Sequence, residues 1–376
     1  MKKIIFGITG LTIGGAERVL VDLANKLSYD YDITIFTLYA KGELEKELNE
    51  NVKLKSLYNK PYKELSKLGQ KLFAPLKVLL LKKSIYKKNI KNDYDVEIAF
   101  LEGPITRLFS VKNEKVRKIA WIHNDISLVF GKGMKSKIKK HLDEKVYDKY
   151  NDLVFVSKDN LDKFNKTYTN LKISEGHKKV IYNYIYKERI IKKSNENIYV
   201  SFDKNSINFV TVARLVYQKG IDRLIKVHKR LIESGYEHNF HIIGDGPERE
   251  KLEKLIKENN VEETFHLLGQ KENPYPYVRQ ADYFCLLSRF EGYGMVLEEA
   301  KILEKNIIIT DTAAREALEG YSNKYVLENT EEGIYNGLLK VLEENMKNGK
   351  DKEKEEVKEQ YDNSNIIKEV KELIGE

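Results

Sequence analysis

The sequence contains little cysteine and proline and no long apolar run. It has 376 residues with one cysteine and six prolines. The single Cys285 excludes an intrachain disulfide and a cysteine-based metal cluster, and its apolar neighbours in YFCLLS favour a buried structural thiol. No stretch reaches the roughly 18 consecutive apolar residues that a transmembrane helix needs. The apolar run after Lys2 and Lys3 is too short for a signal peptide, so we expect a cytoplasmic protein.

Charge is unevenly distributed along the chain. Residues 1–186 carry a net charge of +14, whereas residues 187–376 carry −6. Residues 60–91 contain ten lysines against the single acid Glu64, interleaved with leucines at helical spacing. This pattern suits contact with an anionic membrane, and a solvated amphipathic helix is the alternative interpretation. Because no recognition motif accompanies the basic residues, we expect no nucleic-acid partner.

Short, nearly continuous apolar runs alternate with helical patterns in two successive sets. The first set extends from KKIIFGIT to VIYN and the second from INFVTVA to KYVLE. Such alternation is typical of parallel sheets with helices on both faces. We therefore expect an α/β protein with two doubly wound, Rossmann-like domains facing a central cleft, where ligands meet the carboxyl ends of the strands.

Composition sets the expected domain boundaries. We expect a first domain over residues 1–186, a polar linker over 187–206 and a second domain over 207–350. Helical patterns continue over residues 351–376, and we expect these C-terminal helices to pack back on the first domain.

Three loops after predicted strands carry glycine or paired cations. Gly14 and Gly15 open the first predicted helix and leave its terminal amides free for an anion, although a plain tight turn is the alternative. Arg214 and Lys219 in VARLVYQKG can reach a common point, as recognition of a diphosphate requires; two ordinary surface cations would look the same. Gly244 in IGDGPE suits a strand–turn–helix joint, and close backbone approach to a ligand is the other interpretation.

A fourth loop holds two carboxylates eight residues apart. Glu291 lies in the loop of SRFEGYGMVLEEA, and Glu299 lies more than one turn into the following helix. A carboxylate can accept two hydrogen bonds from the vicinal hydroxyls of a ribose or another sugar. Glu298 is expected to be the exposed neighbour. The apolar face of this helix consists of Met295, Val296 and Ala300.

GGAER, VARLVYQKG, GDGPE and EGYGMVLEEA, in this order, resemble the retaining glycosyltransferases of family 4, which have the GT-B fold. The resemblance covers nearly the whole chain, and the Glu-x7-Glu pair is its most specific part. It implies that a hexose or an N-acetylhexosamine is transferred from a UDP-sugar to a saccharide on the same face of the sugar. The nucleotide-sugar would be a substrate, and no cofactor or metal would be needed. Ala313 and Ala314 depart from the glycine pair that the family often carries.

The resemblance also implies roles for residues of the second domain and for Gly15. Gly15 would approach the donor phosphates or the acceptor, Arg214 and Lys219 would neutralise the diphosphate, and Glu299 would hold the ribose hydroxyls. Glu291 would be catalytic, beside the donor sugar. The remaining donor-binding residues would be Gly244, Gly292, Tyr293, Gly294, Met295 and Val296.

On the acceptor side, His123 in WIHND matches the histidine that such enzymes place near the transferred sugar, which would make it catalytic. A structural histidine is the alternative, with Asp125 as the polar participant. Asn183 in IYNY stands where relatives carry an asparagine in a PNG turn. Gly14, Asp125 and Asn183 would bind the acceptor.

Two Asp-x-Asp pairs match a metal-binding pattern formally. They are Asp30 with Asp32 and Asp93 with Asp95. Both pairs precede predicted strands, at the end of the sheet opposite the expected cleft, so we expect neither to bind a metal.

The basic first domain fits an acceptor linked to polyprenyl diphosphate at the inner face of the cell membrane, as in bacterial capsule or exopolysaccharide synthesis. Two alternatives keep the fold: a sugar-nucleotide epimerase, and a non-catalytic sugar-nucleotide-binding or scaffold subunit of a transferase complex. The set Arg214, Lys219, Glu291 and Glu299 argues against the epimerase, and the glutamate pair argues against the scaffold.

Overall fold

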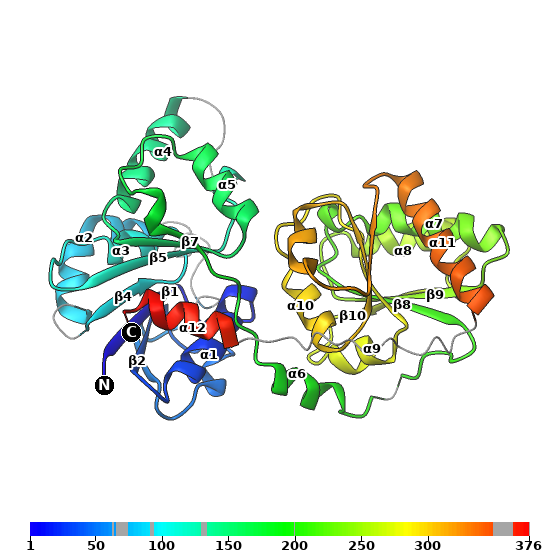
Figure 1. Cartoon of the computed structure of the whole chain (residues 1–376), viewed down its shortest axis with the longest axis horizontal. Helices are drawn as coiled ribbons and strands as arrows, with labels where there is room; N and C mark the ends of the chain where they lie inside the picture. The colour runs from blue at the N-terminus through cyan, green and yellow to red at the C-terminus, as the bar shows by residue number, and fades with distance from the viewer. Residues whose placement is uncertain are drawn as a thin grey trace. The chain divides into compact units, whose positions relative to one another are not determined.

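The computed structural model describes residues 1–61, 64, 74–90, 94–128, 134–198, 200–348 and 364–375. The chain forms two units, each built on one parallel sheet (Figure 1). The first unit comprises Met1–Ile185 with Asn363–Glu376, and the second comprises Tyr186–Asp362. Much of the lysine- and leucine-rich segment 60–91 and most of the segment joining the last two helices lie outside the described residues.

The first unit contains a seven-stranded sheet in the order β3-β2-β1-β4-β5-β6-β7. The strands are β1 (Lys3–Ile8), β2 (Asp32–Tyr39), β3 (Lys53–Tyr58), β4 (Val96–Ala99), β5 (Arg117–Ile122), β6 (Asp152–Phe155) and β7 (Lys178–Val180). Because β1 pairs with both β2 and β4, the winding reverses there and leaves a switch point at the carboxyl ends of β1 and β4.

Helices cover both faces of this sheet (Figure 1). They are α1 (Gly15–Leu27), α2 (Ala74–Asn89), α3 (Pro104–Phe109), α4 (Met134–Tyr147), α5 (Lys158–Thr167) and α12 (Ser364–Leu373). Helices α2 to α5 share one core cluster with the sheet. Lys371 of α12 pairs with Asp30 at 2.8 Å, and Lys2 Nζ donates to the carbonyl of Ile374 at 2.7 Å. The expected return of the chain's end to the first domain is therefore confirmed for residues 364–375.

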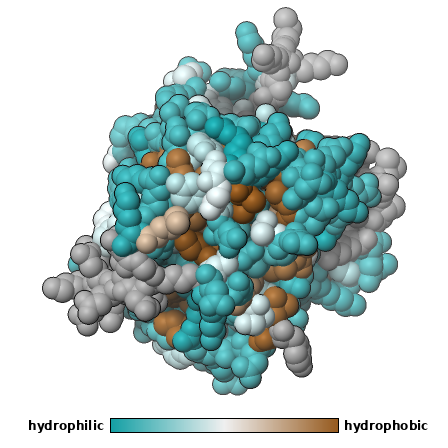
Figure 2. Space-filling model, turned by 90° about the vertical axis from the view of Figure 1, so that its right-hand side faces the viewer, coloured by the Kyte–Doolittle hydropathy of each residue, from teal (hydrophilic) through white to brown (hydrophobic). Residues whose placement is uncertain are grey.

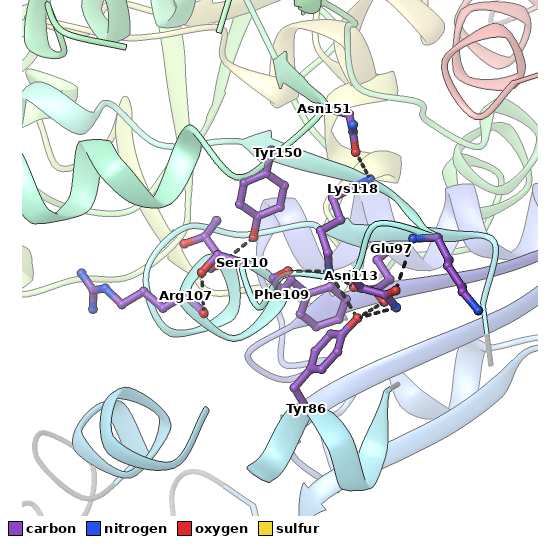
Figure 3. A network of polar contacts seen from close by, with 11 residues as sticks. Tyr86, Glu97, Arg107, Phe109, Ser110, Asn113, Lys118, Tyr150 and Asn151 are labelled. Atoms are coloured by element: carbon purple, nitrogen blue, oxygen red, sulfur yellow. Dashed lines mark hydrogen bonds and ion pairs between the residues drawn. The ribbon is translucent and has the colours of Figure 1, made fainter. Parts of the chain in front are cut away.

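A buried ion pair lies inside the first unit. Glu97 of β4 and Lys118 of β5 have side chains 1% and 3% exposed and contact each other directly. Lys118 Nζ also donates to the carbonyl of Phe109 at 2.8 Å, and Tyr86 of α2 donates to Glu97 at 2.5 Å (Figure 3). The pair thereby fastens α2 and α3 to the sheet.

The second unit contains a six-stranded sheet in the order β10-β9-β8-β11-β12-β13. The strands are β8 (Ile207–Val212), β9 (His238–Ile243), β10 (Phe265–Gly269), β11 (Tyr283–Leu286), β12 (Asn306–Thr310) and β13 (Lys324–Leu327). The helices are α6 (Lys187–Ser194), α7 (Ile221–Glu233), α8 (Arg249–Glu258), α9 (Tyr275–Gln280), α10 (Met295–Ile302) and α11 (Glu331–Asn348). Its switch point lies between β8 and β11.

Successive residues of the second sheet enter different cores. Phe209 packs with the cluster that contains α7, α8 and α11, whereas Val210 packs with the cluster that contains α9 and α10. Cys285 is fully buried in the former cluster, which confirms its structural role. Both faces of the sheet are therefore covered, as the continuous apolar strands indicate.

The segment expected to be a linker, 187–206, contains the helix α6, which packs with the second unit. Asn273 Nδ2 donates to the carbonyl of Lys193 at 2.9 Å, and Ile190 is fully buried. KERIIKKS has only two apolar residues, the adjacent Ile190 and Ile191, so no apolar periodicity indicated this short helix among its charged residues. Within the described ranges, short 3-10 helices lie at Glu45–Glu47, Ile126–Leu128, Glu175–His177, Tyr217–Lys219 and Ala313–Leu318.

No helix within the described ranges is long and apolar enough to cross a membrane. The face of the molecule in Figure 2 is mostly hydrophilic, and apolar residues appear on it in small areas separated by hydrophilic ones.

Candidate active site

The loops that follow β8 and β11 meet at the switch point of the second unit. Lys219 at the end of the first loop forms an ion pair with Glu291 in the second, and their side chains are 16% and 13% exposed. Ser288 Oγ donates to the same carboxylate at 3.2 Å. The structure thus brings together the residues expected to bind the diphosphate and the transferred sugar.

Arg214 lies at the start of the same loop and is exposed. Within the described residues its guanidinium has no hydrogen-bond or ion-pair partner. The nearby α10 begins after Gly294, which has a left-handed φ of 71° and provides no side-chain cap. Two cations and the amino end of a helix therefore belong to the loops at this switch point, an arrangement that suits an anion.

The two adjacent glutamates of α10 have different surroundings. Glu299 is half-buried and accepts a hydrogen bond from Tyr275 at 3.3 Å. The expectation that Glu298 is exposed is wrong: it is 3% exposed, accepts a 2.6 Å hydrogen bond from Tyr293 and pairs with Lys301 at 2.9 Å. Adjacent residues on a helix point about 100° apart, so only one of them can face the loops. Glu298 instead holds Tyr293 in place.

The glycines of the second unit fall into two kinds. Gly244 has a φ of 141°, and a Cβ there would lie 1.9 Å from the carbonyl oxygen of Ala213, so the backbone itself requires glycine. Gly292 is exposed, and a Cβ there would meet no atom of the chain within 4 Å. Met295 and Val296 are half-buried in the first turn of α10. The backbone conformation and packing therefore require glycine at position 244, whereas Gly292 lies beside open space that a ligand can occupy.

In the first unit, His123 directly follows β5. Its ring lies 4.6 Å from that of Phe100, and its Nε2 is buried with no hydrogen-bond partner among the residues that the structure describes. Burial lowers the pKa of His123 to about 3, so the imidazole is neutral at pH 7. A neutral imidazole whose Nε2 lacks a partner can form a hydrogen bond with a sugar hydroxyl.

Glu102 supports the His123 segment, although no sequence motif predicts this role. The carboxylate accepts hydrogen bonds from the backbone amides of His123 and Asn124, and from Asn124 Nδ2 at 2.8 Å. Burial raises the pKa of Glu102 in spite of these hydrogen bonds. The only available signal was its place in AFLEG, three residues beyond the end of the buried strand β4.

The expected acceptor residues have mixed surroundings. Asp125 accepts the backbone amide of Ser127 at 2.9 Å and pairs with Lys163 at 3.1 Å. Partial burial raises the pKa of Asp125, but hydrogen bonds from Ser127 and Lys163 outweigh it and lower the pKa below its usual value. Asn183 is 5% exposed. Both residues are thus held by, or buried in, the first unit.

The glycine pair lies at the amino end of α1. Gly14 is the N-cap residue, and a Cβ there would lie 2.3 Å from a carboxylate oxygen of Glu17. A Cβ on Gly15 would meet no atom within 4 Å. Gly15 therefore has open space beside it, as Gly292 has in the second unit.

The Asp-x-Asp pairs lie at the amino ends of strands. Asp32 begins β2 and pairs with Lys53 at 2.7 Å, and Asp95 accepts the backbone amide of Lys3 at 2.8 Å. Asp93 lies outside the described residues. Among the described residues, no three His, Cys, Asp or Glu side chains are grouped so that they could hold a metal.

Comparison with known proteins agrees with this geometry. The family of glycosyl transferases group 1 matches residues 193–363. A Campylobacter jejuni protein, N-acetylgalactosamine-N,N'-diacetylbacillosaminyl-diphospho-undecaprenol 4-alpha-N-acetylgalactosaminyltransferase, is 30% identical over 354 residues, which cover 92% of this chain and 91% of that protein. The amylovoran biosynthesis glycosyltransferase AmsD of Erwinia amylovora is 26% identical over 80% of this chain and 78% of that protein.

Solved structures agree on the fold. HepE of Anabaena, in complex with UDP, superposes with a TM-score of 0.71 and 16% identity over 100% of this chain and 99% of that chain. At this identity the likeness concerns the fold alone. The two Rossmann-like units are those of a GT-B protein.

Proposed function

The chain belongs to the group 1 glycosyltransferases, and from that premise we propose that it transfers a hexose or an N-acetylhexosamine from a UDP-sugar to a saccharide acceptor. We assign it to the retaining enzymes of family 4. The Campylobacter relative supports this assignment, because its name specifies an α-linked N-acetylgalactosaminyl product. Structures of HepE with UDP and with UDP-glucose support the choice of base.

The observation that carries the proposal is the contact between Lys219 and Glu291 at the switch point of the second sheet. The leaving group of the reaction is a diphosphate, which gains negative charge as the glycosidic bond breaks. Lys219, Arg214 and the amides of α10 would stabilise that charge as fixed donors. Once the diphosphate pairs with Lys219, the carboxylate of Glu291 would be free to contact the transferred sugar.

The remaining roles follow from the chemistry of each side chain. Glu299 would accept the ribose hydroxyls, and neutral His123 would hold a hydroxyl of the transferred sugar. Transfer would proceed on the same face of the sugar through an oxocarbenium-like state, with the departing phosphate taking the acceptor proton. Because cationic side chains supply the charge stabilisation, we propose that no divalent metal is required.

We further propose a lipid-linked acceptor in surface polysaccharide synthesis, with the protein bound peripherally at the inner face of the cell membrane. The Campylobacter relative's name specifies a diphospho-undecaprenol acceptor. In the first unit, large apolar side chains are exposed on α2 and α4. They are Leu79, Leu80, Leu81, Ile138 and Leu142.

Lysines surround these apolar residues, whereas the acids of α4 point inward. Asp143 pairs with Arg107 at 2.8 Å, and Glu144 is 3% exposed. Burial and the nearby Lys149 and Arg107 lower the pKa of Lys82 on α2, which indicates concentrated positive charge. An apolar surface bordered by cations is what an anionic bilayer attracts.

A product assay tests the donor and the acceptor. The full chain would be incubated with UDP-, GDP- and ADP-sugars and an undecaprenyl-diphosphate oligosaccharide, with EDTA and then with Mg²⁺. We expect an α-linked product from a UDP-sugar in EDTA. A β-linked product would exclude the retaining assignment, and activity only with Mg²⁺ would exclude the metal-free mechanism.

Vesicle sedimentation tests the membrane contact. Replacing Lys82, Lys83, Lys87 and Lys88 with Glu should abolish binding to anionic vesicles and leave donor hydrolysis intact. The matched control replaces Lys251, Lys254 and Lys257 on α8 of the second unit. Equal vesicle binding by the α2 variant and the wild type would contradict the proposed membrane contact.

A further inference from the structure

The two loops of the donor site are fastened together by contacts that do not involve Lys219 or Glu291. Arg289, two residues before Glu291, binds both carboxylate oxygens of Asp222 at 2.7 and 2.9 Å. Asp222 lies in the first turn of α7, three residues after Lys219. The same guanidinium donates to the carbonyl of Tyr217 at 2.8 Å. One side chain therefore holds residues on both sides of Lys219.

Backbone contacts reinforce this junction. The amide of Arg289 donates to the carbonyl of Gln218 at 2.8 Å, and Gln218 Nε2 donates to the carbonyl of Phe290 at 3.0 Å. On the far side, Asn329 Nδ2 donates to the carbonyl of Arg289 at 2.8 Å. The backbone next to Glu291 is thus held against the backbone next to Lys219.

The charge of Arg289 is already used within the protein. Its side chain and that of Asp222 are 21% and 19% exposed, and its guanidinium lies 4.0 Å from the ring centre of Tyr217. A planar fork paired with a carboxylate fixes both distance and orientation, which a lysine in its place does not do. Arg289 is therefore poorly suited to bind a substrate phosphate and well suited to hold the loops.

We infer that Arg289 is a positioning residue, whose two-bond pairing with Asp222 keeps Lys219 and Glu291 adjacent while the donor diphosphate replaces Glu291 as the partner of Lys219. Without donor, the Lys219–Glu291 contact itself holds the loops together. Once that contact is exchanged for a diphosphate, the pairing of Arg289 with Asp222 and the backbone contacts beside it keep the ammonium in place. The inference rests on the proposed function, since it presumes a nucleoside diphosphate.

This role has a specific consequence for nucleotide binding. The nucleoside would be held by Glu299 and the Gly244 turn, neither of which takes part in the Arg289 junction. Weakening the junction should therefore reduce the affinity for UDP much more than that for UMP, which lacks the second phosphate. General loosening of the second unit would reduce both affinities alike.

Calorimetric titration of the full chain with UDP and UMP tests the inference. Asp222→Asn and Arg289→Met should each lower UDP affinity about tenfold and change UMP affinity less than about threefold. Arg289→Lys keeps the charge without the fork and should also lose preference for UDP, which guards against misfolding of the methionine variant. Arg230→Met is the matched control, because Arg230 pairs with Glu332 at 2.9 Å and lies 4.0 Å from Tyr335.

The outcomes separate the two proposals. If the wild type binds UDP more tightly than UMP and the junction variants keep that ratio, the positioning role is wrong and the proposed donor stands. If the variants lose UDP and UMP affinity equally, Arg289 is merely structural and the inference is likewise overturned. If the wild type does not bind UDP, the proposed donor fails and this inference fails with it.

Discussion

The two units carry similar sheets but differ in the groups that lie at the carboxyl ends of their strands. In the second unit, Lys219 is paired with Glu291, and Arg289 is paired with Asp222. In the first unit, His123 has a buried Nε2 without a partner among the described residues. The second unit thus has charges that neutralise one another, whereas the first has a neutral group with unused hydrogen-bonding capacity.

This difference matches the two proposed substrates. A diphosphate is negatively charged and can replace a carboxylate as the partner of an ammonium group. Lys219 can therefore bind the diphosphate although Glu291 is its partner in the absence of donor. A sugar hydroxyl is neutral and can meet an unpaired imidazole at little electrostatic cost. The first unit holds a buried ion pair, Glu97 with Lys118, beneath α2 and α3 and away from the carboxyl ends of the strands.

The largest expected effect concerns that buried ion pair. Lys118→Met would leave Glu97 charged and buried, and should lower the free energy of unfolding by about 3–5 kcal/mol. Trp121 is the single tryptophan and lies in the first unit, so its fluorescence during urea denaturation follows that unit. The control Lys53→Met removes an exposed pair with Asp32 and should cost about 1 kcal/mol at most. Equal losses of unfolding free energy in Lys118→Met and Lys53→Met would contradict a stabilising role for the buried pair.

The corresponding charge in the second unit should affect catalysis. Lys219→Met should lower kcat/KM for transfer by about 10²–10³-fold, because it removes one donor to the departing diphosphate. Lys229→Met, on the exposed side of α7, should leave the rate unchanged. Steady-state kinetics with the preferred UDP-sugar measures both. A Lys219 variant within threefold of the wild type would contradict the proposed site.

The units should also differ in acid sensitivity. Burial lowers the pKa of His228 to about 2, of His238 to about 4 and of His241 to about 3. An unfolded histidine titrates near 6.5, so below that pH the unfolded second unit binds protons that the folded one does not. Stability should therefore fall as the pH decreases from 6.5 toward 4, by up to about 1.4 kcal/mol per pH unit for each histidine.

In the first unit, four carboxyl groups act in the opposite direction to His123. Burial raises the pKa of Glu17, Glu97, Glu102 and Glu369, so the folded state holds protons that the unfolded state releases, and acid favours folding through these groups. Between pH 7 and pH 5, circular dichroism, which reports both units, should lose more urea resistance than Trp121 fluorescence. Equal losses of urea resistance by circular dichroism and by Trp121 fluorescence would contradict the expected difference in acid sensitivity between the units.

The smallest effect on stability is expected at the open glycines. Gly15→Ala and Gly292→Ala should change the free energy of unfolding by less than about 1 kcal/mol, since each added methyl meets empty space. Both should lower transfer activity, because that space is proposed for substrate. Gly244→Ala, as a contrast, should destabilise the second unit. Full transfer activity in both Gly15→Ala and Gly292→Ala would show that no substrate approaches the backbone at these two glycines.

Sequence patterns predicted the two parallel sheets because strands covered on both faces are written as continuous apolar runs. The resemblance to the family 4 glycosyltransferases implied that Lys219 and Glu291 serve one donor site, and the structure places the two side chains in contact. Sequence patterns failed for α6, whose two adjacent isoleucines stand among charged residues, and for Glu298, whose single-residue offset from Glu299 turns it inward. Arg289, Asp222 and Glu102 act through tertiary pairing, which spacing along the chain does not reveal.

Hydrogen exchange of the full chain with and without UDP tests the central claim most directly. The account predicts slower exchange at residues 214–222 and 289–299, the loops joined by Lys219–Glu291 and Arg289–Asp222. It also predicts that Lys219→Met largely removes this protection. Unchanged exchange in these two loops, or protection in them that survives Lys219→Met, would contradict it.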